Sequence, residues 1–223
     1  MITVHHLENS RSQRILWLLE ELDLDYEIRR YARDPETSLA PPELIAVHPL
    51  GKAPVITDGE RTIAESGAII EYVLEHYGNG RLVPPAGTPD YEQYRYWMHY
   101  AEGSFMPLMV MSLIFNRIEN APMPFFVKPI ARGIAGKVRG NFIDPNTRRA
   151  LDWMESTLTK QPWFAGREMT AADIQMSFPV EAASVRVGID SGWPELRRFL
   201  DTIHARPAYQ AALEKGGPYA LMN

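Results

Sequence analysis

The sequence predicts an α/β domain over residues 1–78, a linker over residues 79–89 and an all-helical domain over residues 90–223. Three observations support this fold class. Short β-prone runs alternate with helix-periodic runs in the first third of the chain. Glycine and proline then cluster between residues 78 and 89, which is typical of a linker. Beyond this cluster strand signals nearly vanish, and helical periodicity dominates.

The first domain is expected to contain a βαβ unit, then a looser proline-containing segment with a short helix, then a ββα unit. The β-prone runs are Ile2–His5, Tyr26–Tyr31, Pro54–Thr57 and Glu60–Ile63, and the helical runs are Arg11–Leu22, Glu43–Val47 and Ser66–Tyr77. In the first helical run, Ile15, Leu18, Leu19 and Leu22 recur at the spacing of a helix buried along one face. Asp58-Gly59 separates the last two β-prone runs and favours the tight turn of a hairpin.

The second domain is expected to be helical throughout. Asp90–Phe115 has one long helical pattern, with a bend expected at Pro107. After a loop over Asn120–Pro124, helix is expected to resume over Phe125–Leu158, although three glycines weaken that pattern. The remaining helical runs are Met169–Val185, Trp193–Ala205 and Pro207–Glu214.

Composition excludes several kinds of chemistry. The chain contains no cysteine, so disulfides, thiolate metal sites and a cysteine redox centre are impossible, and any reactive sulfur must arrive with a ligand. The longest nearly apolar run, Phe105–Phe115, is 11 residues long, against about 20 for a membrane-spanning helix. The N-terminus lacks the basic and apolar regions of a secretory signal. The six histidines show no metal-like spacing, so no metal site is predicted.

Charge argues against nucleic acid as the main partner, because 23 basic and 28 acidic residues give a net charge of −5. The segment Arg117–Arg149 is the exception, with seven basic and two acidic residues. We expect this segment to form a solvated or dimer-facing surface. Contact with a membrane surface is the alternative, and no stable membrane association is expected.

The first candidate site lies between the first strand and the first helix. Ser10 with Gln13 three residues later has the pattern of a capping box. The other interpretation is functional, because a hydroxyl beside the unpaired N–H groups of a helix N-terminus is well placed to meet an anion.

Two further candidate sites lie at junctions between loops and regular elements. Lys52-Ala53-Pro54 begins the hairpin, and a cis Ala53–Pro54 bond would turn the Ala53 backbone outward to pair with a peptide-like ligand. Glu65 and Ser66 precede the third helix, where they could accept an ammonium group and donate to a carboxylate. The alternative for this last pair is a helix N-cap.

The order of these three sites resembles the cytosolic glutathione transferase family, and the resemblance covers essentially the whole chain. It comprises Ser10 before the first helix, Lys52-Ala53-Pro54, Glu65-Ser66, and the proline-rich linker to a helical half. It also includes Thr170-Ala171-Ala172-Asp173, which looks like the buried capping motif of that family's helical domain. The resemblance implies a thioredoxin-like N-terminal domain, a homodimer in the cytoplasm and a role in detoxification.

Carried over residue by residue, the resemblance assigns a role to each candidate. Ser10 would donate a hydrogen bond to the sulfur of glutathione, as in the serine-using bacterial members, with Ser12 as its competitor for that role. The backbone of Ala53, before Pro54, would pair with the cysteinyl unit. Glu65 and Ser66 would bind the γ-glutamyl end. Lys52 would face the glycyl carboxylate, although Ala53 stands where the family often has valine.

The implied chemistry is attack by the glutathione thiolate, as co-substrate, on a small apolar electrophile or a peroxide. The pocket for the electrophile is expected along Asp90–Phe115, where aromatic and methionine side chains are dense, although most of these side chains are expected in the core. Glu102 is considered only as a residue that reaches the glutathione amine from a partner subunit. The alternative functions are a non-catalytic protein that binds glutathione or apolar ligands, and an interaction protein with the same fold.

Overall fold

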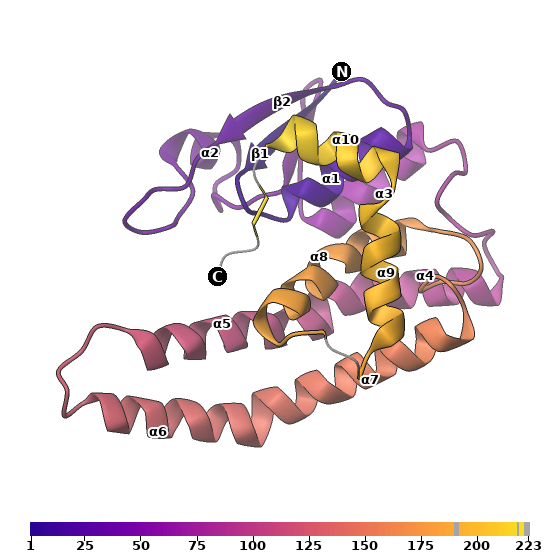
Figure 1. Cartoon of the computed structure of the whole chain (residues 1–223). Helices are drawn as coiled ribbons and strands as arrows, with labels where there is room; N and C mark the ends of the chain where they lie inside the picture. Colours follow the sequence, from indigo (N-terminus) through magenta and orange to yellow (C-terminus); the bar gives the residue numbers. More distant parts are fainter. Residues whose placement is uncertain (190–191, 218, 221–223) are drawn as a thin grey trace.

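A computed structural model describes residues 1–189, 192–217 and 219–220 (Figure 1). The first part of the chain folds around a four-stranded sheet. Its elements are β1 (Ile2–Leu7), α1 (Ser12–Glu21), β2 (Tyr26–Tyr31), α2 (Pro42–Val47), β3 (Val55–Asp58), β4 (Arg61–Ala64) and α3 (Ser66–Tyr77). The sheet order is β2-β1-β3-β4, with β1 and β2 parallel and β3 antiparallel to both β1 and β4. The thioredoxin-like βαβ and ββα units that the sequence predicts are therefore confirmed.

The environment of α1 differs from the prediction of a helix buried along one face. Every residue from Ser12 to Leu19 is buried, including the polar Gln13 and Arg14. The helix packs against β1 and α3 of its own half and against α8 and α10 of the second half. Because α1 is covered on several sides, the predicted apolar face accounts for only some of its contacts, and polar residues of the helix are buried as well.

The second half is helical, as predicted. Its elements are α4 (Pro89–Tyr100), η1 (Ala101–Phe105), α5 (Met106–Asn120), α6 (Lys128–Val138), η2 (Arg139–Ile143), α7 (Asp144–Lys160), α8 (Ala171–Arg186), α9 (Pro194–His204) and α10 (Pro207–Gly216). Figure 1 shows α5 and α6 running side by side away from the sheet, whereas α10 lies against α1. No helix among the described residues is long and apolar enough to cross a bilayer.

The long helical pattern Asp90–Phe115 is broken earlier than the expected bend at Pro107. A single turn of π-helix, η1, separates α4 from α5, and Pro107 lies in the first turn of α5. Pro145 stands in the same position after η2, which interrupts the expected helix Phe125–Leu158. Proline has no N–H group to donate to the carbonyl four residues earlier. Local π-type bonds such as Met106 N–H to the Ala101 carbonyl adjust the backbone just before each proline.

The capping motif at the start of α8 is confirmed. The buried Asp173 carboxylate accepts hydrogen bonds from the backbone N–H groups of Thr170 and Phe164, each at 2.8 Å, and from the Thr170 hydroxyl at 3.1 Å. Burial raises the pKa of Asp173 to about 6, although these hydrogen bonds act to lower it. The motif ties the loop before α8 to the helix start.

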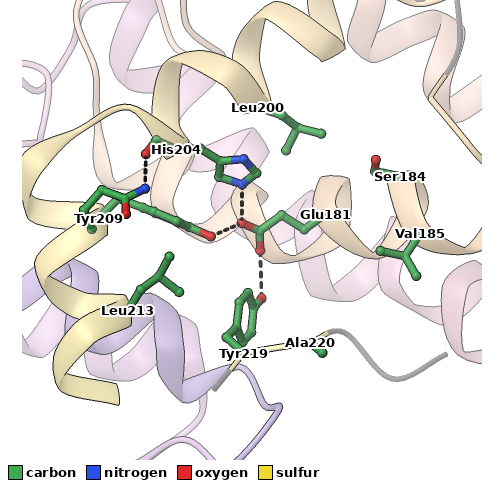
Figure 2. A pocket seen from close by; sticks show the side chains of 10 residues that line it. Glu181, Ser184, Val185, Leu200, His204, Tyr209, Leu213, Tyr219 and Ala220 are labelled. Carbon is green, nitrogen blue, oxygen red and sulfur yellow. Dashed lines mark hydrogen bonds and ion pairs between the residues drawn. The ribbon is translucent and has the colours of Figure 1, made fainter. Parts of the chain in front are cut away.

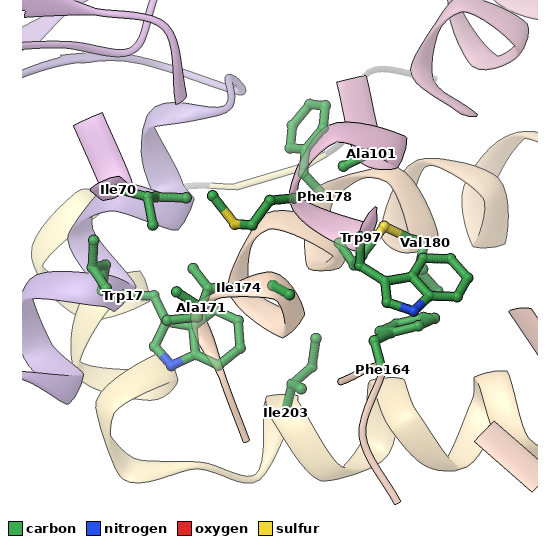
Figure 3. Close-up of a cluster of buried hydrophobic side chains, with 14 of the residues drawn as sticks. Trp17, Ile70, Trp97, Ala101, Phe164, Ala171, Ile174, Phe178, Val180 and Ile203 are labelled. Atoms are coloured by element: carbon green, nitrogen blue, oxygen red, sulfur yellow. The ribbon is translucent and has the colours of Figure 1, made fainter. Parts of the chain in front are cut away.

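One hydrophobic core joins the two halves of the molecule. Figure 3 shows Trp17 of α1 and Ile70 of α3 on one side, and Trp97 and Phe164 on the other, with Ile174 of α8 between them. Both tryptophans are fully buried. The cleft described next lies where loops of the sheet meet the helical half.

Candidate active site

A cleft of about 210 Å³ brings together five of the six residues that the sequence singles out. Its lining is contributed by the loop before β3, by the junction of β4 with α3, and by single residues from before α1 and from η1. The lining residues are Arg11, His48, Leu50, Lys52, Ala53, Pro54, Ala64, Glu65, Ser66 and Glu102. Ser10 is not among them.

Lys52, Ala53 and Pro54 form the wall of the cleft that leads into β3. The Ala53–Pro54 peptide bond is cis, the state that the sequence left open. The Lys52 side chain is exposed and forms no hydrogen bond or ion pair with any described residue. Its ammonium group is therefore free to meet an anionic ligand.

Glu65 and Ser66 line the cleft where α3 begins, next to Pro54, because Ala64 pairs with Val55 in the β3–β4 hairpin. Glu65 has a backbone φ of 73°. Residues other than glycine rarely adopt this conformation, and it recurs at functional sites. Glu65 occupies the N-cap position of α3, but its side chain makes no capping hydrogen bond, so the alternative interpretation as an N-cap is wrong for this side chain. The exposed Glu65 carboxylate pairs with no described residue.

Arg11 and Glu102 line the cleft, and the buried Arg14 contacts Glu102. Sequence reasoning assigned a role to neither arginine. The fully buried Arg14 guanidinium donates to Glu102 at 2.6 Å and to the Ser66 hydroxyl at 2.8 Å. Arg11 donates to both Glu102 oxygens, at 2.9 and 3.0 Å. Although burial acts against ionisation, the two guanidinium groups hold the pKa of Glu102 below its ordinary value.

Glu102 therefore lines the cleft of its own chain, and its contact with the glutathione of a partner subunit stays a prediction. Arg14 also donates to the backbone carbonyl of Gln175 in α8, at 2.6 Å, and so links the two halves. The available signal for Arg14 was its place among the apolar residues of a buried helix, where an unpaired charge would be costly. Sequence alone does not identify the partner of such a residue.

Ser10 and Ser12 lie beside the cleft in a chain of hydrogen bonds that ends at His6. The two hydroxyl oxygens are 2.7 Å apart, and the Ser12 hydroxyl is 2.9 Å from His6 Nδ1. Both serines are buried. The expected capping box of Ser10 with Gln13 is wrong: α1 begins one residue later than that box requires, and both polar atoms of the Gln13 side chain have no partner.

The histidines at the end of β1 are both buried and have neutral partners. His5 contacts the Tyr31 hydroxyl at 2.8 Å. Burial, with Arg30 nearby, lowers the pKa of His6 to about 4. Within the described part of the chain, no three histidine or carboxylate side chains gather in a metal-like group.

The aromatic residues of Asp90–Phe115 divide between core and surface. Tyr94, Trp97 and Phe105 are buried in the core, as expected for most of this set. An open hollow of about 610 Å³ lies along the outer face of α4 and η1, lined by Glu92, Arg95, Tyr96, His99, Tyr100, Gly103 and Ser104. This hollow shares no lining residue with the cleft. The electrophile pocket that the sequence places along Asp90–Phe115 therefore stays a prediction.

A separate cavity of about 450 Å³, between α8, α9, α10 and the chain after α10, was also missed by sequence reasoning (Figure 2). At its wall the buried Glu181 accepts hydrogen bonds from Tyr209 at 2.5 Å, from Tyr219 at 2.7 Å and from His204 at 3.0 Å. Burial and the Glu181 charge raise the pKa of both tyrosines. The hydrogen bonds of the Glu181 carboxylate are thus made with side chains of the protein itself.

Comparisons with known proteins agree with this architecture along nearly the whole chain. The profile of the glutathione S-transferase N-terminal domain matches residues 1–75, and that of the C-terminal domain matches residues 143–207. Glutathione S-transferase 3 of Schizosaccharomyces pombe is 36% identical over 96% of this chain and 88% of its own length. Glutathione S-transferase 1 of Saccharomyces cerevisiae is 33% identical, over 96% and 95% of the two chains.

A solved structure gives the same result. The crystal structure of a glutathione S-transferase from Actinobacillus pleuropneumoniae aligns with a TM-score of 0.75 and 33% identity, over 97% of this chain and 93% of the other. The alignment spans both the sheet and the helical half of this chain. The chain belongs to the glutathione S-transferase family.

Proposed function

We propose that this protein is a glutathione transferase of the serine-using type, in which the cleft holds glutathione and Ser10 stabilises its thiolate. One observation carries the proposal. A cationic side chain, Lys52, and an anionic one, Glu65, line the same small cleft, and neither has a partner among the described residues. Glutathione is a tripeptide that carries carboxylates and an ammonium group, so its charges complement both side chains.

The orientation of glutathione follows from these charges. Lys52 faces the glycyl carboxylate, and the Ala53 backbone pairs with the cysteinyl unit as one strand pairs with another. Where α3 begins, the Glu65 carboxylate accepts hydrogen bonds from the γ-glutamyl ammonium. Ser66 and the unpaired N–H groups at the start of α3 donate to the γ-glutamyl carboxylate. Arg14 holds the Ser66 hydroxyl in place for this contact.

The thiol needs to be ionised, since the thiolate is the nucleophile and a free thiol has a pKa near 8.5. A hydrogen bond from a hydroxyl to a charged acceptor contributes roughly 1.5–3 kcal/mol, which corresponds to a pKa lower by about one to two units. The N-terminus of α1 favours a negative charge further, by about 0.3–1 kcal/mol. No general base is then required.

The hydrogen-bond chain favours Ser10 over Ser12 as the donor. His6 is neutral at pH 7 because burial lowers its pKa to about 4. In the tautomer that carries the ring proton on Nε2, Nδ1 is an acceptor and takes the proton of the Ser12 hydroxyl. Ser12 also donates its backbone N–H to the Ser10 oxygen at 3.2 Å. With the Ser12 proton directed to His6, Ser10 is the donor in the 2.7 Å bond between the two hydroxyls, and its proton turns from the Ser12 oxygen to the sulfur when glutathione binds.

The reaction that follows is transfer of the glutathionyl group through its sulfur. The thiolate forms a carbon–sulfur bond with a small apolar electrophile, either by addition followed by protonation or with departure of a leaving group. With a peroxide it forms a sulfur–oxygen bond while the O–O bond breaks, which gives glutathione sulfenic acid and releases an alcohol or water. Because the chain contains no cysteine, the sulfur comes from the bound tripeptide alone. We infer that the protein acts as a homodimer in the cytoplasm, as the family resemblance implies.

Replacing Ser10 with alanine tests the proposal. We expect the pKa of the glutathione thiol bound to Ser10→Ala to rise by about one to two units, measured by ultraviolet titration of the thiolate in the binary complex. Turnover of a chlorinated aromatic electrophile at neutral pH should fall in parallel.

Ser66→Ala is the matched control, because it should weaken glutathione binding without changing the pKa of the bound thiol. An unchanged thiol pKa in Ser10→Ala would refute the role of Ser10. Failure of the wild-type protein to bind immobilised glutathione would refute the function itself, and binding without turnover would leave only the non-catalytic alternative.

A further inference from the structure

A third cavity, outside both the cleft and the Glu181 cavity, gathers positive charge within the helical half. It has a volume of about 300 Å³ and lies between α5, η2, α7 and the end of α8. Arg139, Arg148 and Arg186 all line it, and Asp144 is the one acidic residue in its lining. Arg139 and Arg148 of the basic segment Arg117–Arg149 thus line a cavity, whereas the sequence predicted a solvated or dimer-facing surface, with membrane contact as the alternative.

Two hydroxyl side chains in this cavity form no hydrogen bond with any residue that the structure describes. Thr147 of α7 is 2% exposed, and its Oγ1 atom is buried without a partner. Ser112 of α5 is 3% exposed and makes no hydrogen bond to a described residue. Buried hydroxyls normally find a partner, and in helices they commonly bond the carbonyl three or four residues earlier.

Other hydroxyls of this protein do form that helical bond. On α7 itself, Thr157 donates to the Trp153 carbonyl at 3.0 Å, and Thr159 donates to the Glu155 carbonyl at 2.9 Å. Ser177 and Thr202 do the same on α8 and α9. Thr147 and Ser112 are thus exceptions, and both line the same cavity.

Two of the three arginines that line the cavity have N–H donors without a partner among the described residues. Arg186 donates from Nη1 to the Met109 carbonyl at 3.1 Å, but its buried Nε atom has no partner. Arg148 is exposed and forms no ion pair or hydrogen bond with a described residue. Arg139 is occupied, since it donates to Asn116 and lies 3.5 Å from Glu119 and 3.9 Å from Asp144.

The electrostatic surroundings favour an anion. Burial, together with Arg11 and Arg117 nearby, lowers the pKa of Arg186, so an anion bound beside this guanidinium would favour its charged form. The rest of the lining includes the buried side chains of Ile143 and Leu151 and the half-buried ring of Trp193. Such a surface suits a ligand with an anionic head and an apolar body.

We propose that this cavity is a second binding site, which takes a small organic carboxylate with an aromatic or aliphatic body. The carboxylate accepts hydrogen bonds from Arg186 Nε, Arg148 and the Thr147 hydroxyl, while the body packs against Ile143, Leu151 and Trp193. The site shares no lining residue with the cleft between the sheet and η1. It is therefore expected to bind whether or not glutathione occupies that cleft.

The test uses 2-naphthoate as the probe and isothermal titration calorimetry as the measurement. The full chain is first saturated with S-hexylglutathione, which fills the cleft and the space next to the sulfur. We expect one 2-naphthoate to bind under these conditions. The neutral amide of the same shape, 2-naphthamide, should bind at least tenfold more weakly.

Two variants and two matched controls locate the site. Thr147→Val and Arg148→Gln should each weaken 2-naphthoate binding at least threefold. Thr157→Val, on the same helix, and Arg149→Gln, next in the chain to Arg148, lie outside the cavity and should change the affinity less than twofold. Thr147→Val should not lower the unfolding temperature, because the hydroxyl that it removes bonds nothing in the protein.

Three results would overturn the proposal: no binding to the saturated protein, equal binding of acid and amide, or equal affinities in all four variants. Arg186 is left intact because it also holds the Met109 carbonyl. Since the measurement is binding in the presence of S-hexylglutathione, failure of this site leaves the transferase proposal untouched.

Discussion

At the scale of single residues, burial decides the chemistry of the polar groups around the cleft. Arg14 is fully buried and keeps its charge compensated through Glu102, the Ser66 hydroxyl and the Gln175 carbonyl. His6 is also buried, but it has only neutral hydrogen-bond partners. A buried charge with a counter-charge stays ionised, whereas a buried imidazole without one stays neutral.

This difference predicts a pH dependence of stability that originates at His6. Its pKa is about 4 in the folded protein and about 6.5 in an unfolded chain. Between these values the unfolded state binds more protons, so the free energy of unfolding should fall by up to about 3 kcal/mol as the pH is lowered from 6.5 to 4. The variant His6→Asn should lack this contribution.

Urea denaturation of both proteins at pH 7 and pH 4.5 measures the effect. The raised pKa of Asp173 gives a pH dependence of opposite sign, because there the folded state binds more protons between about pH 4 and pH 6. Asp173 is present in both proteins, so its contribution cancels in the difference between them. Parallel pH profiles for wild type and variant would contradict the assignment to His6.

At the scale of elements, helix boundaries follow local backbone chemistry. Each π-helical turn comes immediately before a helix with proline in its first turn, at Pro107 and at Pro145. Proline also lies in the first turn of α2, α4, α6, α9 and α10, where its missing N–H group costs no helical bond. The start of α8 depends instead on the carboxylate of Asp173.

Removing that carboxylate should weaken α8 and the loop before it. In Asp173→Asn an amide group replaces one acceptor oxygen, so a buried N–H of Thr170 or Phe164 loses its partner. We expect the free energy of unfolding at pH 7 to fall by about 1–3 kcal/mol, as measured by urea denaturation. Asp201→Asn on the exposed face of α9 is the control and should change it by less than about 0.5 kcal/mol. Equal effects of the two substitutions would show that the motif contributes nothing.

At the scale of the whole molecule, α1 joins the two halves. It lies against β1 and α3 on one side and against α8 and α10 on the other, and the Trp17 ring meets the Tyr209 ring edge-on with centroids 5.2 Å apart. Arg206 of the helical half donates to both carboxylate oxygens of Glu21, at 2.5 and 2.8 Å. Neither half can separate without exposing α1.

We therefore expect the two halves to unfold as one cooperative unit. Thermal unfolding followed by far-ultraviolet circular dichroism and by tryptophan fluorescence should give coincident transitions. Four of the five tryptophans lie beyond the linker, at positions 97, 153, 163 and 193, and Trp17 is in α1. Two separated transitions would mean that the shared core does not couple the halves.

The order of elements could be predicted from the sequence, and five of the six candidate site residues line one cleft, although their roles stay predictions. Hydrophobic periodicity, turn residues and prolines are local signals, and they located β2 and α3 to the residue. The capping box of Ser10 with Gln13 failed because the helix starts one position later, which periodicity does not resolve, although the Ser10 hydroxyl does accept the Ser12 N–H. The pairing of Arg14 with Glu102, 88 residues apart, has no local signal at all.

The sequence by itself determined that this chain builds a sheet domain and a helical domain, and that any reactive sulfur belongs to a ligand, since these follow from local patterns and from the absence of cysteine. Only the tertiary structure decided which charges meet. It covered α1 on several sides, brought Glu102 into the cleft of its own chain and turned part of a basic segment into the lining of a cavity. The physical reason is that burial and pairing of charges depend on distances between residues far apart in the chain, which no local pattern encodes.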